Sequence, residues 1–260
     1  MNRLLSFVLT SGVLITCMPA SAVVVSVADV ADSRVDLNQP TTSFPTGDVF
    51  AAKEGAPETV ATNLQFFYTQ FNLPSGLTGQ NIQTVNSAQL ALARTGPNFS
   101  LTYHVYGVFD GLDTGSADGY TWNSGVGYDP SHKLVKFLSA DEISYYSDPA
   151  KSSFVGTIDT GTPGAGPFDF TSIPQSPTAV ANLKNLILND TDGRITFYVG
   201  VRQNFGVDPL NTFASRENPN FPAPTLTLDY ISKVVPEPSG NILGMFGALA
   251  LFIVRRRQAD

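Results

Sequence analysis

The chain has little of several residue types on which exported domains and enzymes often depend. Its 260 residues include one cysteine, Cys17, one tryptophan, Trp122, and two histidines, His104 and His132. Because Cys17 lies in the N-terminal apolar stretch, the rest of the chain has no thiol, which excludes disulfides and cysteine chemistry there. The stability of that part must therefore come from the packing of a hydrophobic core.

Recognisable catalytic motifs are also missing. The sequence has no Gly-x-Ser-x-Gly elbow, no His-Glu-x-x-His zinc helix and no phosphate-binding glycine loop. His104 falls inside an alternating segment and is interpreted as a structural residue, and His132 is interpreted as a turn residue. Carboxylates such as Asp141 and Glu142 could form the catalytic pair that a glycoside hydrolase needs, so this function stays an alternative. Their spacing in the sequence does not give the distance between them in the fold. We predict that the protein is not an enzyme.

Basic residues are outnumbered, with 15 Lys and Arg against 22 Asp and Glu, and the net charge is −7. This balance argues against nucleic acid or an anionic membrane surface as a partner. Loss of the two terminal segments discussed next would remove four arginines and Asp260, leaving a net charge of about −10. An acidic surface suits a solvated exported protein and permits Ca²⁺ binding.

The N-terminus has the three parts of a secretory signal peptide. Arg3 precedes an uncharged run over residues 4–18, and the small residues Ala20, Ser21 and Ala22 follow. We expect cleavage after Ala22, with Ala20 and Ala22 as the small residues that the peptidase requires. Residues 1–22 are therefore assigned to a signal peptide, and the protein to export through the inner membrane.

The C-terminus combines a proline-rich tripeptide, an apolar run and an arginine cluster. Pro236 and Pro238 fix φ, so that they and Glu237 are expected to be extended and exposed. As a helix, residues 242–254 span about 20 Å, less than the ~30 Å of a hydrocarbon core. The following arginines favour the cytoplasmic side. We predict a short membrane helix anchored by Ile242, Leu243, Phe246, Leu249, Leu251, Phe252, Ile253 and Val254, with Arg255, Arg256 and Arg257 as its cytoplasmic stop.

This order of features, over about the last 25 residues, resembles the PEP-CTERM sorting signal of Gram-negative bacteria. The resemblance implies an exosortase, a membrane enzyme similar to cysteine transpeptidases, as a processing partner. Pro236, Glu237 and Pro238 would be its recognition residues, and the helix would be a temporary anchor. It also implies delivery to the cell surface, the outer envelope or the exopolysaccharide matrix.

Residues 23–232 are expected to form one domain, and residues 233–260 the linker and sorting signal. Many strands, long turns and few helices favour an all-β fold, an antiparallel sandwich. Residues 179–188 carry an apolar stripe and predict a single helix. Period-two runs of β-branched and aromatic residues predict strands at 63–71, 87–94, 101–109, 194–202 and 224–231.

Several segments, taken in order, resemble the DNRLRE domain. The similar segments are 66–74, 87–92, 103–108, 120–123, 212–217 and 224–230. The resemblance implies a jelly-roll β-sandwich related to carbohydrate-binding modules, some of which bind acidic polysaccharide. The chain departs from the pattern in its long segments 111–119 and 139–166, so the identity of the ligand does not carry over.

Carboxylates and aromatic rings provide the candidate binding residues. Asp110, Asp113 and Asp118 crowd one glycine-rich segment and are candidate ligands of a structural Ca²⁺, although no cofactor is required and Asp-Gly is also ordinary turn chemistry. The turn at 189–193 and the pair Asp29 and Asp32 are weaker cases. The candidate glycan contacts, whose flat faces could stack on sugar rings, are Tyr120, Trp122 and Tyr128.

The sequence therefore predicts an exported, surface-sorted, non-catalytic protein, a structural or adhesive component of the envelope or of the exopolysaccharide matrix. One alternative is a carbohydrate-binding module with a defined polysaccharide ligand, acidic polysaccharides included. The other is a polysaccharide hydrolase or lyase.

Overall fold

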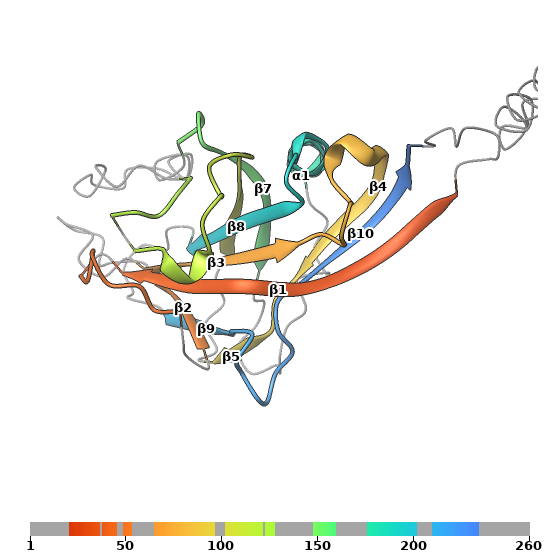
Figure 1. Cartoon of the computed structure of the whole chain (residues 1–260). Coiled ribbons are helices and arrows are strands. Elements are labelled where there is room, and N and C mark those ends of the chain that lie inside the picture. Colours follow the sequence, from red (N-terminus) through yellow and green to blue (C-terminus); the bar gives the residue numbers. More distant parts are fainter. Residues whose placement is uncertain are drawn as a thin grey trace, which may run out of the picture.

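The computed structural model describes residues 21–36, 38–45, 49–53, 65–96, 102–121, 123–127, 148–159, 176–201 and 210–233, with the backbone alone at 49–53, 102, 159, 201 and 210–211. Strands dominate this part of the chain, together with one α-helix and two short 3-10 turns (Figure 1). The strands are β1 (Ala22–Asp36), β2 (Val49–Lys53), β3 (Gln65–Asn72), β4 (Ile82–Ala91), β5 (Arg94–Gly96), β6 (Thr102–Val108), β7 (Ser152–Asp159), β8 (Arg194–Val201), β9 (Leu210–Ala214) and β10 (Thr225–Ser232). The helices are η1 (Gly79–Asn81), η2 (Ala117–Gly119) and α1 (Pro177–Asn189).

The 15-residue strand β1 joins two parts of a curled antiparallel sheet (Figure 1). Its first half pairs with β10, which pairs in turn with β4. Its second half pairs with β3, beyond which lie β8, β6 and β7. The register shifts between Asp29 and Ala31, at the point where β1 changes partner. A bulge at such a point bends a strand and increases its twist, which fits the curl of this sheet.

The expected all-β class is confirmed, because strands make up most of the described structure and α1 is the single α-helix within it. Each predicted strand overlaps an observed one, namely β3, β4, β6, β8 and β10, and the helix predicted at 179–188 lies within α1. Alternation is clearest in β10, where Leu226, Leu228 and Tyr230 are buried and their neighbours are half-buried. The strands β1, β2, β7 and β9 were not predicted, and Asp29 and Asp32, which precede the first predicted strand in the sequence, lie inside β1.

One face of the sheet forms the larger of two hydrophobic cores. This core takes side chains from β3, β4, β6, β7, β8, β9, β10 and α1. Burial of a single phenylalanine of this kind contributes roughly 2–3 kcal/mol. The fully buried aromatic side chains at its centre are Phe67, Phe71, Tyr103, Phe197 and Phe213.

The other face of β3, β6 and β8 is also covered, by the loop that follows β6. Tyr106 stacks on Tyr198 with centroids 5.0 Å apart, and Tyr68 meets Tyr120 edge to face at 4.9 Å. The Tyr68 hydroxyl donates to the Val126 carbonyl at 2.7 Å. The Tyr198 hydroxyl donates in the same way to the Gly127 carbonyl at 3.1 Å, so these two hydroxyls hold the loop against the sheet. Burial on both faces explains why 66–71 reads as one continuous run of buried residues instead of an alternation.

Helix α1 begins with Ser176 as N-cap, whose hydroxyl accepts from the Ala179 amide, and with a proline in its first turn. Its buried side chains include Leu186, which lies directly against Gly107 of β6. Any side chain at position 107 would collide with Leu186. The C-terminal end of α1 touches η1 just as closely, at Gly79. Glycines thus bring α1 close to the sheet on one side and to η1 on the other.

Both ends of the described core lie together. Ala22, the first residue of β1, pairs with Ile231 near the end of β10. The two strands reach the same extremity of the molecule (Figure 1). Residues 1–20 of the predicted signal peptide, with Ala20, and the predicted sorting signal, with Pro236, Glu237, Pro238 and the apolar run, lie outside the described residues. Within the described residues, no helix has the length and apolar character needed to cross a membrane.

Candidate functional site

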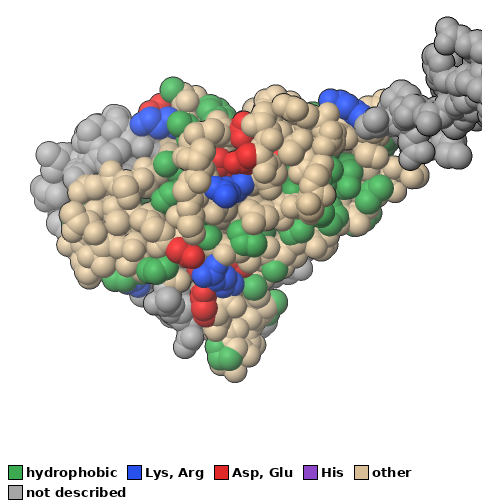
Figure 2. Space-filling model, viewed as in Figure 1, with side chains coloured by type: hydrophobic (Ala, Val, Ile, Leu, Met, Phe, Trp, Pro, Cys, Tyr) green, Lys and Arg blue, Asp and Glu red, His purple; other side chains and the backbone are tan. Residues whose placement is uncertain are grey.

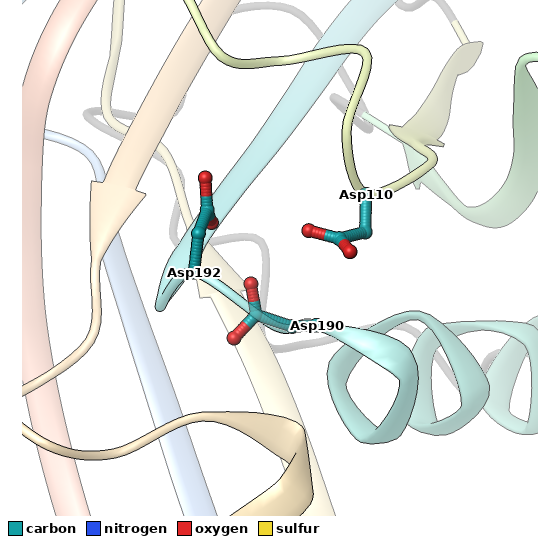
Figure 3. A group of neighbouring side chains, drawn as sticks. All are labelled: Asp110, Asp190 and Asp192. Atoms are coloured by element: carbon teal, nitrogen blue, oxygen red, sulfur yellow. The ribbon is translucent and has the colours of Figure 1, made fainter.

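Three aspartates from two separate segments meet at the C-terminal end of α1 (Figure 3). Asp110 follows β6, while Asp190 and Asp192 belong to the turn between α1 and β8. One carboxylate oxygen from each lies within 4.8 Å of the others. Figure 3 shows the carboxylate of Asp110 directed toward the other two. The fold therefore joins residues that are about 80 positions apart in the chain.

The turn that carries Asp190 and Asp192 is fixed by its own side chains. Asp190 accepts from the amides of Gly193, at 3.0 Å, and Arg194, at 3.1 Å. Asp192 accepts from the same Arg194 amide at 2.9 Å. Gly193 has φ of +78°, a conformation that favours glycine. Thr191 then reaches across to donate to Asp110 at 2.6 Å, which connects the turn to the loop after β6.

Asp190 lies in an environment that opposes its charge. It is only 2% exposed. Burial raises its pKa to about 7, and the nearby Asp192 and Asp110 carboxylates also raise it, whereas the hydrogen bond from the Gly193 amide lowers it. The Oδ1 atom of Asp110 is buried and has no hydrogen-bond donor among the described residues. A buried carboxylate such as Asp190 suits a hard cation, and without a cation it favours proton uptake.

The structure does not group the three aspartates that the sequence placed together. Only Asp110 belongs to the cluster in Figure 3. Asp113 is 1% exposed, and burial raises its pKa to about 6. Asp118 lies in η2, accepts from the Asp32 amide at 3.0 Å and pairs with Arg216 at 3.3 Å. The turn at 189–193, a weaker candidate in the sequence, supplies the two carboxylates that lie next to Asp110, those of Asp190 and Asp192.

A cavity of about 450 Å³ opens beside Asp110, between α1 and the strands β6 and β7. Amide side chains from successive turns of α1 form one wall, with Ser153 of β7 opposite. Phe109 and Leu186 supply apolar surface. The cavity thus combines hydrogen-bonding groups with a small apolar area. Its lining residues are Phe109, Asp110, Ser153, Asn182, Asn185, Leu186 and Asn189.

A second polar cluster surrounds the bulge of β1. Asp29 and Asp32 are both buried there, and Asp32 accepts from the Arg216 amide at 2.9 Å. The Arg216 guanidinium donates to the Val30 carbonyl and pairs with Asp118. Burial, with the neighbouring Asp32, raises the pKa of Asp29 to about 9, and burial raises that of Asp32 to about 6. The raised pKa of Asp29 favours its protonated form at neutral pH, and the bond between Asp32 and the Arg216 amide fastens the bulge to the segment after β9.

The residues proposed for stacking on sugar are not displayed together. Tyr120 is 7% exposed and packs on Tyr68, so its ring belongs to the second core and offers no open face. Trp122 and Tyr128 lie outside the described residues, as does His132. His104 is buried on β6, with its ring 5.0 Å from that of Phe154. Figure 2 shows acidic and basic side chains lying next to one another at several places on the face drawn.

No family model matches the chain, and a search of curated proteins found no similar sequence.

Proposed function

We propose that this chain is an exported protein of the cell envelope, sorted to the surface or the exopolysaccharide matrix, with a structural or adhesive role. The observation that carries the proposal is the pairing of the start of β1 with the end of β10, where Val23, the first residue of the expected mature chain, lies opposite Tyr230. It means that β1 begins and β10 ends at one extremity of the β core. A domain built in this way can be held at that extremity while the rest of its surface stays accessible to the surroundings.

The sequences before β1 and after β10 indicate how the protein would be held at that extremity. The segment before β1 has the pattern of a signal peptide, and the segment after β10 has that of a PEP-CTERM sorting signal. On this proposal the chain crosses the inner membrane and is retained by the helix at 242–254. An exosortase then acts near Pro236, Glu237 and Pro238. The β core itself is proposed to be a jelly-roll sandwich of the DNRLRE type.

A non-catalytic role fits the burial of Asp29 and Asp32. Glycoside hydrolysis needs two carboxyl groups roughly 5–9 Å apart on either side of an accessible substrate. Asp29 and Asp32 are buried in the β1 bulge and cannot flank a glycan there. A structural Ca²⁺ remains part of the proposal, with Asp110, Asp190 and Asp192 as its most favourable ligands.

Cell fractionation with a sorting-signal variant tests the proposal. In a host that has an exosortase, the unchanged protein is expected in the outer envelope or medium. Glu237→Ala is expected to leave it in the inner membrane, and Glu217→Ala, which changes an acidic residue inside the domain, serves as the control. Equal distribution of all three proteins would contradict recognition of Glu237.

The second candidate function is carbohydrate binding, and a specific observation favours it. The cavity beside Asp110 is lined by three asparagines, one serine and one aspartate. Such groups, with a few apolar contacts, are typical of sites that orient small polar ligands. The adhesive role and carbohydrate binding are compatible, since attachment to a glycan would retain the released protein in the matrix.

A further inference from the structure

The asparagines of α1 are unusual for an exposed helix face. Asn182, Asn185 and Asn189 follow one another at intervals of three and four residues, which places them on one side of the helix. Asparagine is a poorer helix former than the Lys, Glu or Gln that commonly occupy such positions. Local structure explains only part of this choice: Asn182 donates to the Phe154 carbonyl at 2.8 Å, and Asn189 ends the helix. Helix stability therefore gives no reason for Asn185.

The same three side chains line the cavity beside Asp110. Its volume of about 450 Å³ lies in the ~300–1,000 Å³ range of small-ligand sites. An amide offers both a donor and an acceptor, the combination that neighbouring hydroxyl groups require. Ser153 and Asp110 add oxygen atoms on the opposite side, and Phe109 adds apolar surface that can cover the C–H groups of a ring.

Charge at the cavity restricts the ligand further. Among the described residues that line it, Asp110 is the single charged one. Asp190 and Asp192 bring further carboxylate oxygens within 4.8 Å of that of Asp110. Neither Lys nor Arg is among these described lining residues, so without a cation bound to the three aspartates a carboxylate or sulfate on the ligand would meet like charge. An uncharged polyhydroxylated molecule meets no such repulsion.

We infer that the cavity between α1 and the strands β6 and β7 binds a neutral saccharide, whose hydroxyls are bonded by Asn185, Asn189 and Asp110. This inference rests on the carbohydrate-binding candidate above and narrows it to uncharged sugars. It also moves the site from the aromatic residues Tyr120, Trp122 and Tyr128 to the amide face of α1.

Affinity electrophoresis of the full-length chain tests the inference. The protein is run in a polyoxyethylene detergent, because a maltoside headgroup would compete, through gels that contain galactomannan, glucomannan, dextran, alginate or polygalacturonate. The variants are Asn185→Ala and Asn185→Ala/Asn189→Ala, and alanine is the better helix former, so α1 is retained. Asn86→Ala, an exposed amide on β4 that bonds Asp229, is the matched control.

The expected result is retardation by at least one neutral polysaccharide. The affinity is expected to fall about fivefold to tenfold with Asn185→Ala and further with the double variant, and to stay unchanged with Asn86→Ala. Retardation by alginate or polygalacturonate alone would overturn the inferred neutral ligand and leave carbohydrate binding standing. Neutral retardation that the α1 variants do not alter would overturn the site, and no retardation in any gel would overturn both the inference and the carbohydrate-binding candidate.

Discussion

Replacement of Gly79 by alanine tests how the candidate site is held in place. A Cβ atom at this position would lie 2.5 Å from the Leu188 carbonyl carbon and would collide with the backbone oxygens of Ile187 and Leu188. Backbone atoms cannot rotate away as a side chain does, so the end of α1 or η1 must move. The Gly79 amide also donates to the Asp190 carbonyl at 2.8 Å, a bond that this movement would weaken.

The expected cost follows from these two contacts. Overpacking of this kind costs roughly 1–3 kcal/mol, and a weakened backbone hydrogen bond adds about 1 kcal/mol. Gly79→Ala is therefore expected to lower the free energy of unfolding by about 2–4 kcal/mol, which corresponds to a urea midpoint about 1–2 M lower.

Gly119→Ala provides a matched control, because nothing lies within 4 Å of a Cβ atom added there. Its urea midpoint is expected to stay close to that of the unchanged protein. If Gly79→Ala and Gly119→Ala unfold at the same midpoint, α1 does not approach η1 as described, and the placement of Asp190 is wrong.

Two aspartates and one core leucine yield three further predictions. Because the pKa of Asp29 is raised to about 9, the folded chain keeps a proton that the unfolded chain loses near pH 4, so the contribution of Asp29 to stability falls as pH rises between these values. Asp29→Asn should therefore make urea midpoints less dependent on pH, and an unchanged pH dependence would refute the raised pKa of Asp29. With a chelator present, Asp192→Asn should raise the melting temperature, because it removes the repulsion between the Asp192 and Asp190 carboxylates. A lower melting temperature of this variant would contradict the repulsion. Leu186→Ala should cost about 2–5 kcal/mol in urea unfolding, and a loss under 1 kcal/mol would contradict its burial.

Sequence pattern identified the strands whose two faces differ. In β10, leucines and a tyrosine alternate with half-buried residues, so the period of two is visible in the chain itself. β1 escaped prediction for a physical reason. Its valine run adjoins the predicted signal peptide, and the register shift after Asp29 breaks the alternation where the strand changes partner.

The candidate site was only partly accessible from sequence. The turn chemistry of Asp190, Asp192 and Gly193 could be read locally, and the structure bears it out in the hydrogen bonds to the amides of Gly193 and Arg194. The meeting of that turn with Asp110 depends on how α1 packs across β6, which no local pattern encodes. Tyr120 was a candidate glycan contact in the sequence, but in the structure it packs on Tyr68. Nothing in its glycine-rich segment indicates that the loop folds over this residue.

The mass of the protein isolated from the envelope or the surrounding matrix tests the central claim most directly. The proposed export and sorting predict a chain that begins at Val23 and lacks Arg255, Arg256 and Arg257. Intact-mass measurement, with peptide mapping of both ends, distinguishes this form from the precursor. A mature protein that still extends from Met1 to Asp260 would contradict the account.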